Sequence, residues 1–185
     1  MHSLNFSLAV AIACVAFVVT PASSRAPHKL ERNVTDTFEL FDKFPYVVLV
    51  YSSGEDAEFQ CLTNKRTELD MQAKKATYVW MFKGGNGRTR KNVALHLSAG
   101  DAPDRAVFTL DDDTKNTKVA HFVYTDYKDC VIVEIPYDGD QCQLWVSKEV
   151  EDDVPQHCLD HLEDICDVTE EEYSKELCQN QVDDI

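Results

Sequence analysis

The fold of this chain is constrained most by a regular series of short apolar segments that turn residues separate. From residue 46 onward, eight candidate strands follow one another. They span residues 46–52, 59–67, 76–83, 92–98, 106–110, 118–125, 131–136 and 141–147. The segments between them hold glycine, asparagine and aspartate, which readily adopt the backbone conformations of tight turns. This spacing predicts an all-β domain, either a sandwich or an up-and-down antiparallel barrel.

The pattern changes after residue 147. Pro155 is preset for a first helical turn, and the apolar positions around and after it have helical spacing. These positions are Cys158, Leu159, Leu162, Ile165 and Cys166. Thr169 and Glu172 have the spacing of a capping box that opens a second short helix ending at Cys178. One or two helical turns are also expected at residues 36–44, ahead of the strands.

The N-terminus has the composition of a secretory signal. Residues 8–19 form an uninterrupted apolar run, and small residues follow at positions 22–24, as signal peptidase requires. Cleavage near Ser24 removes Cys14 and leaves one domain, residues 25–185, with six cysteines. An even number of cysteines in a secreted chain predicts three disulfides, and the sequence alone leaves fifteen pairings open. The sequon at Asn33 predicts N-glycosylation, in keeping with secretion.

The net charge of −15 is concentrated near the C-terminus. Residues 149–185 hold fourteen acidic residues and Lys175 as their only lysine or arginine, so they carry −13 of that charge. Such a surface repels nucleic acid and anionic membranes, and it attracts cations or basic proteins. We therefore expect neither a nucleic-acid nor a membrane partner.

The last candidate strand, residues 141–147, indicates which way its side chains face. Side chains alternate across a strand, so Cys142 and Val146 share one face, and Gln143 and Trp145 share the other. The face with Cys142 and Val146 is apolar and carries a thiol. The helical stripe that follows is also apolar and carries thiols. We expect cysteines to clamp that helix to the outside of the sheet. Gln143 and Trp145 then face the interior, which in a closed eight-stranded barrel is wide enough for one small ligand.

A set of short motifs resembles the salivary lipocalins of ticks, whose best known members bind histamine. The motifs are DTFELF at residues 36–41, FQC at 59–61, DCVIVEIP at 129–136, QLWV at 143–146 and VPQHCLDHL at 154–162. Their order and the cysteine placement carry the likeness over nearly the whole mature chain. The resemblance implies a secreted, eight-stranded antiparallel up-and-down lipocalin barrel, most simply a monomer, with a C-terminal helix packed outside.

The same resemblance implies the disulfide pairings. Cys61 is expected to pair with Cys178, and Cys130 with Cys158. Cys142 is then left to pair with Cys166, which agrees with the assignment of faces on the last strand. In function, the resemblance implies a protein that sequesters a small host mediator and so suppresses host defence.

The amine site of the family is incomplete in this chain. The histamine-binding members have a glutamate at the position of Gln143 and an acid at the position of His121. The first inter-strand loop of this chain keeps acids at Glu55 and Asp56 but lacks the tryptophan of the family. The residues we expect to contact ligand, at one barrel mouth and along the walls, are Asp36, Asp42, Tyr51, Glu55, Asp56, Tyr78, Trp80, Phe108, His121, Gln143 and Trp145.

Three ligand classes stay open. A biogenic amine such as histamine or serotonin ranks first on family grounds. The alternative is a leukotriene or another fatty acid, whose carboxylate would meet His121, Arg105 or Arg66. The third is a host protein, a complement component or an antibody, bound through the outer surface.

No catalytic set stands out in the sequence. The serines at positions 52, 53, 98, 147 and 174 lack a G-x-S-x-G elbow. His157 and His161 are four residues apart, a spacing that suits zinc, but a structural zinc needs further fixed ligands and the nearby cysteines are expected in disulfides. We expect no enzyme activity, no metal and no cofactor.

Overall fold

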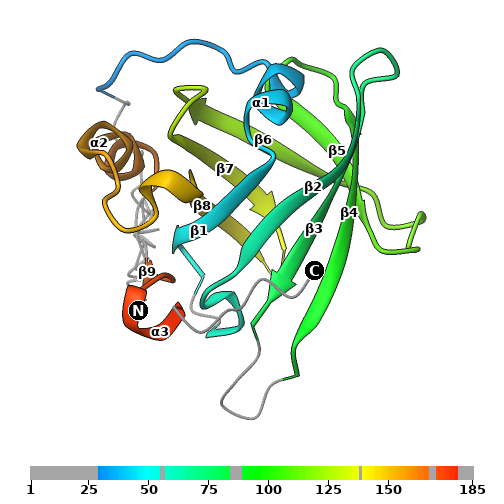
Figure 1. Ribbon diagram of the computed structural model, residues 1–185. Coiled ribbons are helices and arrows are strands. Elements are labelled where there is room, and N and C mark those ends of the chain that lie inside the picture. The colour runs from blue at the N-terminus through cyan, green and yellow to red at the C-terminus, as the bar shows by residue number, and fades with distance from the viewer. Residues whose placement is uncertain (1–28, 55–56, 84–88, 138, 167–169, 179–185) are drawn as a thin grey trace, which may run out of the picture.

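The computed structural model describes residues 29–54, 57–83, 89–137, 139–166 and 170–178. Eight antiparallel strands form an up-and-down barrel (Figure 1). They are β1 (Tyr46–Ser52), β2 (Thr63–Asp70), β3 (Lys75–Phe82), β4 (Lys91–Ala99), β5 (Arg105–Leu110), β6 (Lys118–Thr125), β7 (Cys130–Pro136) and β8 (Asp140–Ser147). Each strand pairs with its neighbour in sequence, and β1 pairs with both β8 and β2, which closes the barrel. The predicted fold class is confirmed.

The barrel interior is filled from strands whose side chains alternate between buried and partly exposed. In β3, Ala76, Tyr78, Trp80 and Phe82 are buried while the residues between them are not. The period of two side chains on a pleated strand produces this pattern when one face meets the core and the other meets water. The interior is therefore the principal hydrophobic core.

A second core lies on the outside of the barrel, under the helix α2 (Gln156–Ile165). Here β1 and β7 consist mostly of apolar residues, because both of their faces are covered. Ile132, Leu144 and Val146 are fully buried against Leu162 and Ile165 of the helix. The helical stripe predicted from the sequence thus has its partner surface on β7 and β8.

Three disulfides fasten the C-terminal third to the barrel. They join Cys61 to Cys178, Cys130 to Cys158, and Cys142 to Cys166. These are the pairings that the family resemblance implied. Cys142 points away from the interior, as its place opposite Gln143 and Trp145 on β8 requires.

The helix α1 (Thr37–Lys43) covers one end of the barrel (Figure 1). Asp36 caps it, because the Asp36 carboxylate accepts hydrogen bonds from the backbone N–H groups of Phe38 and Glu39 at 2.9 and 3.0 Å. Phe38, Leu40 and Phe41 insert into the core. The short helix predicted at residues 36–44 is confirmed.

Two predicted elements are wrong. The second strand begins at Thr63 rather than at residue 59, because Ala57–Phe59 forms the 3-10 helix η1 and Cys61 has a φ of 59°, which interrupts extended backbone. The predicted second helix is instead the short strand β9 (Glu170–Glu171) followed by α3 (Lys175–Cys178). The N–H of Glu172 donates to the Val50 carbonyl at 2.9 Å, so the free edge of β1 holds this segment extended.

Other sequence features fall partly outside the described residues. The predicted signal, residues 1–24, and the cap residue Thr169 lie outside them. Asn33 is described and exposed. In the part of the chain that the structure describes, no helix has the length and apolar character needed to cross a membrane.

Removing the Cys142–Cys166 disulfide is expected to free the end of α2. In the Cys142→Ala, Cys166→Ala double variant, the free energy of unfolding should fall by about 3 kcal/mol. Amide hydrogen exchange should also accelerate at residues 162–166, because Cys130–Cys158 anchors only the first turns of the helix. The matched Cys61→Ala, Cys178→Ala variant should leave exchange in α2 unchanged. Unaltered exchange at residues 162–166 in the first variant would contradict the proposed clamp.

Candidate ligand-binding chamber

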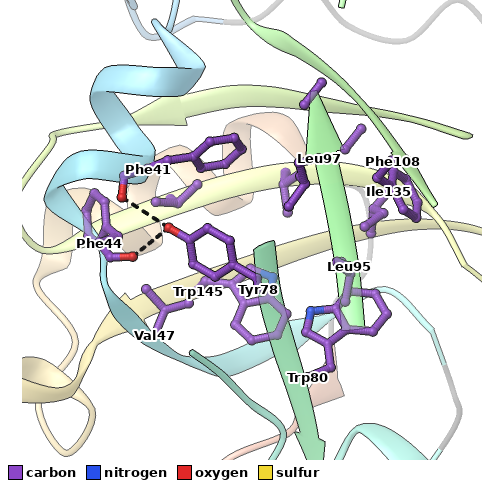
Figure 2. Close-up of a cluster of buried hydrophobic side chains, with 14 of the residues drawn as sticks. Phe41, Phe44, Val47, Tyr78, Trp80, Leu95, Leu97, Phe108, Ile135 and Trp145 are labelled. Carbon is purple, nitrogen blue, oxygen red and sulfur yellow. Dashed lines mark hydrogen bonds between the residues drawn. The ribbon is translucent and has the colours of Figure 1, made fainter. Parts of the chain in front are cut away.

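The barrel encloses a cavity of about 60 Å³. Its walls come from α1 and from strands on all sides of the barrel, and most of them are aliphatic or aromatic (Figure 2). None of the described residues that line it is an aspartate, glutamate, lysine, arginine or histidine. The chamber is therefore a small, uncharged and mainly apolar space.

Two tryptophans dominate the middle of the chamber. Trp80 on β3 and Trp145 on β8 are nearly parallel, with 6.4 Å between ring centroids and an interplanar angle of 14°. Their exposed fractions are 1% and 4%. Both rings reach the cavity, so they offer flat apolar walls to anything that enters it.

A hydrogen-bonded tyrosine closes the end of the chamber under α1. The Tyr78 hydroxyl donates to the carbonyl oxygens of Phe44 and Phe41 at 2.7 and 3.2 Å (Figure 2). Burial raises the pKa of Tyr78 well above its usual range, and the nearby Arg66 guanidinium only partly opposes this effect. The hydroxyl therefore stays protonated and remains a donor at physiological pH. The Arg66 guanidinium itself donates to the carbonyl oxygens of Phe41 and Asp42.

A second aromatic cluster packs against Trp80 at the end of the barrel opposite α1. Tyr137, in the turn between β7 and β8, packs edge-on against Trp80 at 4.9 Å and lies 5.8 Å from Phe59 of η1 and 6.5 Å from Phe82. Lys91 donates to the Glu58 carboxylate at 2.5 Å beside this cluster, and that hydrogen bond raises the pKa of Lys91. Ligand pockets usually need roughly 300 Å³ or more. The chamber must therefore enlarge to hold a ligand of ordinary size.

One buried amide in the wall lacks a hydrogen-bond partner. Gln143 is fully buried, and its Oε1 accepts a hydrogen bond from Trp145 Nε1 at 3.0 Å. Its Nε2 has no partner among the described residues, and neither does the buried Oδ1 of Asn64 on β2. A buried donor left unpaired costs about 1–3 kcal/mol. Both amides line the cavity, so the chamber holds unused hydrogen-bonding capacity.

Comparison with known proteins decides the family. A family model described as tick histamine binding protein matches residues 28–180, which is most of the chain. The chain belongs to this tick histamine-binding family. Among curated proteins, none matches the chain at a significant level. The family and the barrel are those of small-ligand-binding lipocalins rather than enzymes.

Solved structures agree on the lipocalin fold. Japanin from Rhipicephalus appendiculatus, bound to cholesterol, has a TM-score of 0.52 and 13% identity, covering 69% of this chain and 90% of japanin. The serotonin complex of AM182 has a TM-score of 0.57 and 9% identity, covering 82% and 95%. Lobster apocrustacyanin A1 has a TM-score of 0.51 and 9% identity, covering 78% and 89%. At these identities the likeness shows the fold alone.

The lipocalin barrel brings five of the expected ligand-contact residues into its interior. Tyr78, Trp80, Gln143 and Trp145 line the cavity. Phe108 belongs to the same buried cluster but does not line the cavity (Figure 2). Their contact with a ligand stays a prediction.

Two of the expected residues lie on the outer surface instead. His121 alternates with the inward-facing Ala120 and Phe122, so it points outward, where its ring nitrogens lie 3.0 Å from Glu134 Oε2 and 3.2 Å from Asp104 Oδ2. Tyr51 packs with the outer cluster under α2. A break in the β1–β8 register between Leu49 and Tyr51 shifts the alternation of β1 at that point. The expectation that His121 and Tyr51 face the chamber is wrong.

The structure describes two of the four acids expected at one mouth. Asp36 and Asp42 are exposed at the α1 end of the barrel, and Asp36 is occupied as a helix cap. Glu55 and Asp56 lie outside the described residues. The expectation that the four acids share one mouth therefore stays a prediction.

Sequence reasoning missed two features of the chamber. Asn64 sits in a mainly polar strand, and its inward direction shows only in its alternation with the buried Leu62. Tyr137 lies in a turn beside Asp138 and Gly139, where an aromatic residue gives no sign that it folds back over the barrel. Both positions depend on closure of the barrel.

The one described cluster with metal-ligand types does not form a metal site. It consists of Asp126, Cys130, His157 and Cys158. Cys130 and Cys158 are bonded to each other and supply no thiolate. His157 Nε2 lies 2.8 Å from Asp126 Oδ2, and these two groups pair with each other.

Replacing Tyr78 by phenylalanine is expected to destabilise the α1 end of the chamber. The change removes one hydroxyl and leaves the carbonyl oxygens of Phe44 and Phe41 without this donor, so the free energy of unfolding should fall by about 1–3 kcal/mol. Chemical denaturation measures the change. Tyr124→Phe is the control, because no hydrogen bond joins the Tyr124 hydroxyl to another of the described residues. Equal stability of the two variants would refute a structural role for the Tyr78 hydroxyl.

Proposed function

We propose that this lipocalin is secreted in tick saliva and captures a small host inflammatory mediator in its chamber, so that the mediator no longer reaches host receptors. The observation that carries the proposal is the aromatic-walled chamber inside a barrel of the histamine-binding family. Three disulfides and an exposed sequon at Asn33 support an extracellular protein. Capture is stoichiometric, without turnover.

The charge of the chamber favours an uncharged mediator. An ammonium group taken from water into an apolar space is unfavourable unless a carboxylate meets it. The described lining offers none, and at the position where the histamine-binding members carry a glutamate this chain has the neutral Gln143. The geometry therefore supports an uncharged, mainly apolar mediator over a free amine.

A fatty acid with a free carboxylate fits less well for a related reason. Of the cations expected to meet it, His121 is turned to the outer surface, and Arg105 stands opposite His121 across the β5–β6 pair, on the same outer face. Arg66 donates to backbone carbonyl groups at the α1 end. A neutral lipid or a neutral aromatic compound does not need a cation in the chamber.

A biogenic amine is the second candidate, and the family match favours it. Its ammonium group would need a carboxylate at the mouth opposite α1. Of the acids near that mouth, Glu58 is already paired with Lys91. Glu55 and Asp56 are the remaining acids of the same connection.

Binding to the chamber is tested by fluorescence titration of protein purified from a eukaryotic host with histamine, serotonin, a leukotriene and cholesterol. At least one uncharged compound should quench Trp80 and Trp145 and show a single site. Trp145→Phe and Trp145→Ala should weaken binding about tenfold or more while the circular dichroism spectrum stays that of a barrel. Met71→Ala, at an exposed site, is the control. Unchanged affinity in both Trp145 variants would rule out the chamber as the site.

The two ligand classes are separated by the loop acids. If an amine is the ligand, Glu55→Gln together with Asp56→Asn should reduce affinity for serotonin or histamine by tenfold or more, since a charge-assisted hydrogen bond is lost. If the ligand is uncharged, its affinity should change less than twofold. A large loss for cholesterol or another neutral compound would contradict our assignment.

A further inference from the structure

We propose that Gln143 and Asn64 recognise a hydroxyl group, or another neutral group that both accepts and donates hydrogen bonds, on a mainly apolar ligand. This inference rests on the proposed function and names the chemistry that the chamber selects. It depends on two buried amide atoms that have no partner in the described part of the chain.

The orientation of the Gln143 amide is fixed by its neighbour. The indole Nε1–H of Trp145 is a donor only, and it lies 3.0 Å from Gln143 Oε1. If the amide turned round, it would place its NH₂ group against that N–H, so the carbonyl oxygen must face Trp145. The two N–H groups of Nε2 are left without a protein acceptor, in a side chain whose exposed fraction is 0%.

The backbone holds Gln143 in this place from both sides. It pairs with Ser52 of β1 and with Val133 of β7 in the middle of the barrel wall. The side chain points inward because it alternates with Cys142 and Leu144, which face the outer core. It cannot reach solvent to satisfy Nε2 without leaving the cavity that it lines. An acceptor for this donor has to come from inside the chamber.

Asn64 supplies the complementary group from another wall. It pairs with Val47 of β1 and Trp80 of β3, and its buried Oδ1 also lines the cavity without a donor. A hydroxyl group both accepts and donates, so it matches the pair of needs that these amides leave. An ammonium group donates but accepts nothing, and a carboxylate accepts but does not donate. The amides therefore discriminate by hydrogen-bond type as well as by charge.

Three indole probes of one shape separate these possibilities. Tryptophol carries a hydroxyl group at the end of its side chain, tryptamine carries an ammonium group, and 3-ethylindole carries neither. Hydrophobic transfer alone makes 3-ethylindole the tightest ligand, because it has the most apolar surface. Recognition by the amides reverses that order, so tryptophol should bind the wild-type protein about tenfold more tightly than 3-ethylindole.

The variants test which residues cause the reversal. In Gln143→Met, which keeps the length of the side chain, and in Asn64→Leu, the preference for tryptophol over 3-ethylindole should disappear. Calorimetry measures the ratio of the affinities for tryptophol and 3-ethylindole within each variant. A general loosening of the chamber affects both affinities and so cancels in this ratio. Gln72→Met, at an exposed turn, should keep the wild-type ratio. If one variant fails to fold, the other still tests whether the amide that it removes recognises the hydroxyl group.

Each result supports or overturns a defined claim. If tryptophol and 3-ethylindole both bind and 3-ethylindole binds as tightly or more tightly, amide recognition is wrong while capture of uncharged ligands stands. The same holds if the preference for tryptophol survives in both variants. If tryptamine binds more tightly than tryptophol, the preference for uncharged ligands and the role of the amides are both wrong. If none of the probes binds, capture in this chamber is overturned as well.

Discussion

Closure of the barrel is the constraint on which the rest of the structure depends. β1 provides it by pairing with β8 between Val47 and Ser52 and with β2 over its first three residues. Once the sheet is closed, every strand has an inner and an outer face, and the alternation of side chains decides which residues share the interior. Beyond Val48, the C-terminal half of β1 no longer pairs with β2, and β9 pairs with this free edge instead. The positions of the chamber, of α2 outside the barrel and of β9 all depend on this closed pairing of strands.

The inner and outer cores have different roles in the structure. The outer core under α2 is stapled by disulfides and makes β1, β7 and β8 rigid from behind. The inner core can therefore keep a cavity and two unpaired amide atoms, features that would otherwise favour collapse. Charge is kept out of the chamber: His121 lies between two carboxylates on the outer face, and no charged side chain among the described residues lines the cavity. The result is a neutral interior in a strongly acidic protein.

The two ends of the barrel interior are held by similar kinds of contact. Under α1, Tyr78 is tied to two backbone carbonyl groups, and helix and barrel are joined there by hydrogen bonds. At the other end, Tyr137 packs against Trp80, Phe59 and Phe82, and its side chain is also hydrogen-bonded to Lys91. Both ends therefore combine aromatic packing with hydrogen bonds.

The sequence by itself determined the eight strands and the apolar stripe of α2, because these depend only on local periodicity and turn chemistry. The inward face of β8 could be predicted because Cys142 on its other face matches the thiols of the helical stripe. The sequence also supplied the family motifs from which the disulfide pairing followed. It failed where a tertiary contact overrides local pattern: Glu172 is extended because β1 has a free edge, and Tyr51 turns outward because of a register shift. The outward direction of His121 and the inward directions of Asn64 and Tyr137 were likewise decided only when the barrel closed. Strand periodicity gives two faces but does not say which one becomes the inside, and that choice is made by the long-range pairing of β1 with β2 and β8.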